Sequence, residues 1–278
     1  MSYETSVEEA EATAEKGFQC AEFIFLFMKN RWENSLEHIK PENLREIILI
    51  SLWQRAYCWL QTLARLNGDA YFQAIATASR ALLEIYVDMV LIHFDTTNEK
   101  SDKLFWWYNS EKLKAFELQI KYELENNLPN DPSLLDFINE NKAKIENNRL
   151  RVWGVKKHPK FNRWTNNTLN LDVKEVDELC HAEIKKFLGR SLQHHYETEY
   201  RRVNWDIHSG ITSVYGYREQ KFSLNNFGYF WDSSNFGILC TRLILTEFRF
   251  AQVIPNYEQE FEQLQVKQNK FLPLPCIK

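Results

Sequence analysis

The chain has 278 residues, 44% of them hydrophobic and 14% aromatic, and is long enough to bury one large core or two small ones. Its formal net charge of −4 excludes a general electrostatic attraction to nucleic acid, so a polyanion would have to bind a local basic patch. The five cysteines are widely separated, odd in number and never in a C-x-x-C pair, which argues against a disulfide framework and a structural zinc site.

The N-terminal stretch MSYETSVEEAEATAEK is acidic and lacks the basic-then-apolar order of a signal peptide. No apolar run approaches the roughly 18 residues of a membrane span, so we expect no membrane partner. The cysteine pattern favours reduced thiols, and together these features predict a cytoplasmic protein.

Glycine and proline are sparse, and the apolar residues between them recur at helical rather than alternating spacing. The sequence therefore predicts an all-α fold in a single domain over 1–278, with a core bundle at about 42–254, a basic loop at 149–171 and a loose tail at 271–278. Asp131-Pro132-Ser133 is a typical helix start. The expected helices are, in chain order, 5–33, 42–67, 70–94, 101–127, 132–150, 172–189, 191–217, 234–254 and 256–270.

The expected helix 70–94 contains ALLEIYVDMVLIHF, which is apolar almost all round and predicts a central helix. Its exceptions, Arg80, Glu84 and Asp88, are spaced by four and form one polar seam. Two interpretations stay open. Either the seam faces water and forms an ion pair within the helix, or Glu84 meets an arginine of another helix because a partly buried charge needs a partner.

The expected helix 191–217 contains the stretch YRRVNWDIHSG, in which an apolar stripe including Tyr200 runs at steps of three and four. Each residue turns a helix by about 100°, so Arg201 and His208 return to nearly the same direction, with Asn204 between them. Arg202 is expected to point away from that face and to be solvated. The three polar residues flank the core stripe, where a pocket between packed helices would be lined.

The stretch RRVNWDIH resembles the R-x4–6-H signature of the HEPN superfamily of helical bundles, with His208 following Arg201 or Arg202. A small polar residue often follows that arginine directly, where this chain has Arg202 or Val203. ASRALLEIYVDMVLI together with YETEYRRVNWDIHSG is also similar to a family of uncharacterised all-helical bacterial proteins with an Arg-x-x-x-Glu helix and a later Tyr-Arg…His helix. The resemblance covers about 70–218 and implies an elaborated HEPN-like bundle with extra N- and C-terminal helices.

The resemblance implies a metal-independent endoribonuclease of a bacterial defence or stress system, whose active site forms where two bundles meet in a homodimer. His208 would serve as acid or base and Arg201 would bind the phosphate. Asn204 would orient the histidine, and Glu84 would hold Arg201. Residues expected to support this site are Arg80, Tyr200 and Arg202.

A non-catalytic bundle is the alternative interpretation of the same residues. His208 would then be an interhelical histidine with a hydrogen-bond partner, and Arg201 would be an ordinary member of an ion pair. Such a protein would use the polar seam to bind a partner protein or a small ligand, and a regulatory partner protein is possible for either function.

The stretch from Arg149 to Leu171 contains six Lys or Arg, no acidic residue and three interleaved aromatics. Cations that bind phosphates and aromatics that stack on bases are the ingredients of single-strand RNA binding. The alternative is a surface loop whose aromatic side chains pack on the bundle. The residues expected to bind RNA are Lys156, Lys157, Lys160, Arg163 and Trp164.

A Glu-x-x-His step occurs at Glu178 and His181, and a carboxylate-bridged di-metal bundle would require a second such step, which the sequence lacks. We therefore expect no metal site and no cofactor. The adjacent His194 and His195 are expected to be exposed.

Overall fold

The computed structural model describes residues 7–35, 39–68, 71–158, 163–207, 222–248 and 256–272. Within these ranges every regular element is helical and no strand occurs, which confirms the all-α class. The chain divides into two compact units, Met1–Phe94 with Asp172–Lys278 as unit 1 and Asp95–Leu171 as unit 2. Each unit is described by itself.

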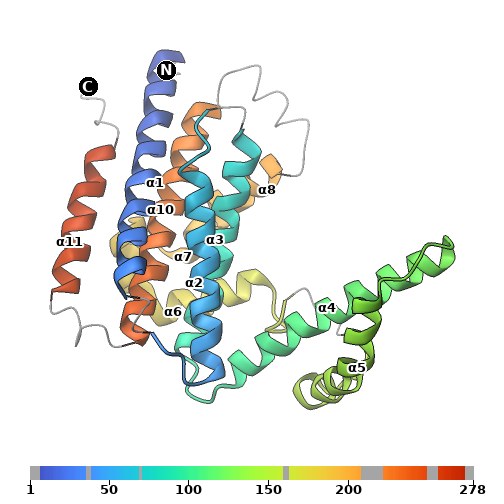
Figure 1. Cartoon of the computed structure of the whole chain (residues 1–278). Helices are drawn as coiled ribbons and strands as arrows, with labels where there is room; N and C mark the ends of the chain where they lie inside the picture. Colours follow the sequence, from blue (N-terminus) through green and yellow to red (C-terminus); the bar gives the residue numbers. More distant parts are fainter. Residues whose placement is uncertain are drawn as a thin grey trace. The chain divides into compact units, whose positions relative to one another are not determined.

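Unit 1 is a bundle around α3, Phe72–His93, which packs against α2, α8 and α10 (Figure 1). The prediction of a central helix is confirmed, because α3 is buried on nearly every side. The other helices of this unit are α1 (Val7–Ser35), α2 (Leu44–Leu63), α6 (Leu169–Leu188, from Asp172 onward), α7 (Leu192–His195), the π-helix η3 (Tyr196–Tyr200), α8 (Arg201–Ile207), α10 (Phe222–Glu247), α11 (Tyr257–Gln268) and the 3-10 turn η5 (Asn269–Phe271).

Helix α10 begins at Phe222, well before the start expected at 234. The expected start was wrong, and the polar residues Asn226, Asp232 and Ser233 of this stretch are helical and buried in the bundle. Gly237 on the same helix permits a close approach to α2, since a Cβ atom there would lie 2.3 Å from the Leu60 Cδ1 atom.

Unit 2 is a helical hairpin made of α4, Glu99–Glu125, and α5, Pro132–Trp153 (Figure 1). Its small core contains Trp106, Leu113 and Ile145. The predicted start at Asp131 is confirmed, because its carboxylate accepts the Ser133 N–H at 2.9 Å and Pro132 opens the helix. Residues 149–153 continue α5, so the basic segment leaves the helix only at Gly154, whose φ of 70° suits a helix end.

No helix in the described ranges combines the length and the apolar character needed to cross a membrane.

Candidate functional site

The helical segment 192–207, formed by α7, η3 and α8, carries a polar cluster on each of two faces. We call the first the α3-side cluster, made of Arg80, Glu84, Tyr196, Tyr200 and Arg201. We call the second the α10-side cluster, made of Arg190, His195, Glu199, Arg202 and Asp232. A π-helix at 196–200 is an uncommon element that occurs often at functional sites.

In the α3-side cluster, Glu84 binds two partners through its Oε1 atom. Arg80 Nε donates to it at 2.8 Å along α3, and the Tyr200 hydroxyl donates at 2.6 Å from the facing helix. The Arg80 guanidinium lies 5.6 Å from the centre of the Tyr200 ring. The ion pair within the helix is therefore present, and the partner from another helix is a tyrosine rather than an arginine.

Burial and the neighbouring Glu84 carboxylate raise the pKa of Tyr200, so this hydroxyl stays protonated and remains a donor. Burial by itself lowers the pKa of Arg80, but the hydrogen bond to Glu84 and the charges around it reverse this effect, and the net pKa is raised. Arg80, Glu84 and Tyr200 thus form a pre-organised charged network between α3 and η3.

Arg201 does not reach Glu84, which corrects the expectation that Glu84 would hold it. Its guanidinium pairs with Glu197 at 2.9 Å, one turn earlier on its own helix, and its side chain is 57% exposed. The reason is geometric, because Tyr200 occupies the direction toward α3 and the next residue turns away by about 100°. Arg201 lies 5.9 Å from the Tyr196 ring, which stacks on the Tyr200 ring at 5.0 Å.

Asn204 lies on α8, one turn after Tyr200. Its Oδ1 atom is buried and has no hydrogen-bond partner among the described residues. A buried acceptor without a donor is costly, so this atom marks a place where a further donor fits. His208, the residue predicted to act beside it, lies outside the described residues.

In the α10-side cluster, Arg190 donates to both carboxylate oxygens of Asp232, at 3.2 and 3.4 Å, and pairs with Glu199 at 3.5 Å. Arg202 pairs with the same Glu199 and not with the Arg201 face, and its side chain is 42% exposed, so it points away and is partly solvated as the sequence predicted. His195 Nδ1 lies 3.8 Å from Asp232 Oδ2. These groups connect the segment 192–207 to α10.

His195 is only 3% exposed, and its ring contacts Phe236 edge to face at 5.3 Å. The expectation that His195 is exposed was wrong, because its position on α7 turns it toward α10, whereas the preceding His194 is exposed as predicted.

Burial shifts the pKa values of Asp232 and His195, the two most deeply buried groups of this cluster, in opposite directions. Burial raises the pKa of Asp232 to about 7, although Arg190 opposes the rise. Burial and the charge of Arg190 lower the pKa of His195 to about 3. At neutral pH the histidine is therefore uncharged, and the aspartate exchanges its proton near physiological pH.

Sequence reasoning missed the α10-side cluster, although a signal for part of it was present. The R-x4–6-H spacing applied to Arg201 also fits Arg190 and His195, with four intervening residues, and Ser191 is a small polar residue directly after the arginine. Asp232 carried no such signal, because it is distant in sequence and comes to the cluster only through packing.

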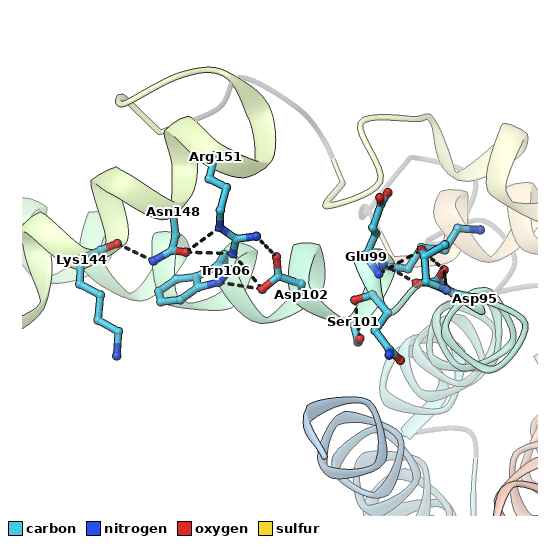
Figure 2. Close-up of polar contacts among 11 residues, drawn as sticks. Asp95, Glu99, Ser101, Asp102, Trp106, Lys144, Asn148 and Arg151 are labelled. Atoms are coloured by element: carbon cyan, nitrogen blue, oxygen red, sulfur yellow. Dashed lines mark hydrogen bonds and ion pairs between the residues drawn. The ribbon is translucent and has the colours of Figure 1, made fainter.

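The basic segment uses part of its charge internally. Arg149 is buried and donates to Ser110 Oγ at 2.8 Å, and burial lowers its pKa. Arg151 forms an ion pair with Asp102 at 2.7 Å, beside the indole of Trp106 (Figure 2). Trp164 is 3% exposed, so its face is not open for stacking on a base.

Two expected RNA-binding lysines, Lys156 and Lys157, are exposed. Arg163 is partly buried, and Lys160 lies outside the described residues. The exposed positive charge of the described part of this segment is therefore smaller than its sequence suggested.

The Nδ1 atom of His181 lies 3.5 Å from the Oδ1 atom of Asp177, one turn earlier on the same helix. Asp177 does not belong to a Glu-x-x-His step, so this contact is not half of a di-metal site. Within the described ranges, no three His, Cys, Asp or Glu side chains are grouped so that they could hold a metal ion.

Comparison with known proteins identifies a family, but the function of that family is unknown. Neither a curated protein nor a solved structure matches the chain. One family model matches residues 46–226, which is more than half of the chain and includes the segment 192–207. The chain therefore belongs to a family of unknown function, DUF5677.

Proposed function

We propose that the protein acts on RNA as a metal-independent endoribonuclease of the HEPN type, with the exposed edge of the α3-side cluster as its phosphate-binding surface. The observation that carries this proposal is the exposed Arg201 guanidinium beside the stacked rings of Tyr196 and Tyr200. A forked guanidinium suits a phosphate, and the partly exposed ring of Tyr196, which stacks on the buried ring of Tyr200, suits an unstacked base.

The ion pair between Arg201 and Glu197 leaves the guanidinium available. Both side chains are more than a third exposed, and an exposed pair at this helical spacing contributes only about 0.3–0.5 kcal/mol. A phosphate dianion or diester oxygen can therefore replace the carboxylate at small cost.

The proposed chemistry is attack of a ribose 2′-hydroxyl on the adjacent phosphorus, which forms a 2′,3′-cyclic phosphate and breaks the bond from phosphorus to the 5′-oxygen of the next nucleotide. The 2′-hydroxyl loses its proton to a base, and the departing 5′-oxygen takes one from an acid. His208 serves as acid or base, because helical spacing in the sequence directs it to the same side as Arg201. Arg201 stabilises the charge that develops on the phosphate. The Oδ1 atom of Asn204, which has no described donor, accepts the imidazole N–H and orients the ring.

The remaining polar residues position this surface in the proposal. Glu84 and Arg80 hold Tyr200 from α3, and Arg202 and Arg190 hold the opposite face of the segment. His195 is buried and neutral, so it is assigned a packing role rather than proton transfer. Lys156 and Lys157 contribute exposed charge that attracts RNA.

The test is cleavage of a labelled mixed-sequence RNA in the presence of a chelator. We expect wild type to cleave, and His208→Ala and Arg201→Ala to lose about a hundredfold or more of the rate. His194→Ala is the matched control, since it removes an exposed histidine from the same segment, and it should stay within about twofold of wild type.

Circular dichroism must show that each variant is folded. If wild type does not cleave RNA with chelator or with divalent metal restored, the nuclease proposal fails. Equal loss of activity in His194→Ala would also contradict it, because that side chain lies outside both clusters.

A second candidate function is favoured by the internal pairing of both clusters. Arg80 pairs with Glu84, and Arg190 and Arg202 pair with Asp232 and Glu199, as in a structural seam. A non-catalytic bundle that binds RNA, a regulatory partner protein or a small ligand fits this pairing. The homodimer and the defence or stress setting of the first proposal rest on the HEPN resemblance.

A further inference from the structure

The distal half of the hairpin in unit 2 carries an apolar groove that the side chains of α4 and α5 line but do not fill. The groove has a volume of about 480 Å³. Its walls are two aliphatic side chains from each helix, and its rim is formed by charged residues. The lining residues are Glu117, Ile120, Lys121, Leu124, Glu125, Leu135, Ile138 and Lys142.

The groove continues the apolar stripe of the hairpin beyond its core. The core ends at Leu113 on α4, and Ile120 and Leu124 follow on the next turns of the same helix. Leu124 is 60% exposed, which is costly for a large aliphatic side chain beside an apolar groove. Two helices alone cannot cover such a stripe, whereas four can enclose it as a bundle.

The charges on the rim indicate what covers it. Lys121 pairs with Glu125 at 3.7 Å along α4, and Lys142 pairs with Glu117 at 2.8 Å across the hairpin. The rim therefore carries equal numbers of both signs and offers no net attraction to a purely basic or purely acidic partner.

The order of the α4 charges is self-complementary. Lys121 and Glu125 lie one turn apart on the same flank of the stripe formed by Ile120 and Leu124. When two such helices pack antiparallel about a two-fold axis, residue i faces residue j of the other copy and j faces i. With the axis halfway between the two charges, each Lys121 faces the Glu125 of the other copy.

We propose that a second copy of this chain covers the groove, with the two α4 helices antiparallel and their Leu124 side chains buried between two hairpins. The interface lies within unit 2 and differs from the meeting of two bundles that the HEPN resemblance implies. It does not depend on the proposed ribonuclease function.

The first measurement is sedimentation equilibrium of the full chain over about 1–200 μM, because a short helical interface gives a dissociation constant in roughly the micromolar range. We expect the average mass to rise from 33.3 kDa toward twice that value. Leu124→Lys should raise the dissociation constant at least about tenfold, since the two-fold axis places two charges in the apolar seam.

The matched control is Leu118→Lys. Leu118 lies on the same helix and is 57% exposed, but it does not line the groove. This variant should dimerise within about twofold of wild type. Both positions are exposed, so neither substitution should prevent folding, and circular dichroism checks this.

A charge exchange tests the pairing itself. Lys121→Glu sets two like charges against each other and should weaken the dimer by about threefold to tenfold. The double variant Lys121→Glu with Glu125→Lys restores both the pair within the helix and the pair across the interface, and should recover the wild-type dissociation constant.

Three results would overturn the inference. A chain that stays monomeric over the whole range has no such interface. A dimer that Leu124→Lys does not weaken uses another surface. A double exchange that remains as weak as Lys121→Glu shows that Lys121 and Glu125 do not face each other across the dimer.

Discussion

The two polar clusters on the segment 192–207 both pair arginines with carboxylates, but they differ in how deeply the carboxylate is buried. In the α10-side cluster, Asp232 is almost fully buried and its pKa rises to about 7. In the α3-side cluster, the carboxylate of Glu84 is about a third exposed and is held by Arg80 and by a tyrosine hydroxyl. Burial, rather than residue type, decides which cluster holds the helix and which can exchange its partners with a ligand.

The largest effect should come from removing the buried carboxylate. Asp232→Ala leaves Arg190 without its main partner, and we expect a loss of about 3 kcal/mol in the free energy of unfolding, measured by urea denaturation at neutral pH. Asp232→Asn keeps an acceptor for Arg190 and resembles the protonated acid, so at neutral pH it should be at least as stable as wild type. Equal losses in both variants would show that shape rather than charge governs this cluster.

The second effect is a pH dependence with opposing contributions. The pKa of Asp232 is raised from 3.8 to about 7, so its contribution to stability is lost as pH rises between these values. The pKa of His195 is lowered from 6.5 to about 3, so its contribution is lost as pH falls through that window. The two slopes oppose each other between about pH 4 and pH 6.5.

Asp232→Asn separates the two slopes, because it removes the aspartate titration and keeps the histidine. The stability of wild type relative to Asp232→Asn should fall by on the order of 3 kcal/mol as pH rises from about 4 to about 7. Urea denaturation at several pH values measures this difference. A difference that does not change with pH would show that Asp232 titrates as an ordinary aspartate.

The smallest effect belongs to the α3-side cluster. Tyr200→Phe removes the hydroxyl that donates to Glu84, but Glu84 still accepts the hydrogen bond from Arg80. We therefore expect a loss of about 1 kcal/mol in the free energy of unfolding. The stacked neighbour gives the control, since Tyr196→Phe should cost less than about 0.5 kcal/mol. If both substitutions cost the same, the hydrogen bond to Glu84 is not what connects the helices.

The fold could be predicted wherever the signal is local. Helical spacing of apolar residues identified α3 as the central helix, and Asp131 with Pro132 identified the start of α5. The start of α10 was placed too late, and the polarity of Asn226 and Asp232 by itself does not show that these residues are helical and buried.

The candidate site was predictable only in part. The seam of Arg80 and Glu84 follows from spacing by four, and their ion pair is present. The partner of Glu84 on the facing helix could not be chosen, because Tyr200 and Arg201 are adjacent and a rotation of about 100° exchanges one for the other. His208 lies outside the described residues, so its role stays a prediction.

The sequence by itself determined the helical class, the apolar faces and the charge pattern along each helix, because these follow from residue periods within one or two turns. Only the tertiary structure decided that Arg190, His195 and Asp232 meet, and that burial leaves the histidine neutral. The physical reason is that pairing and desolvation depend on which elements pack together, and neither is written in the local order of residues.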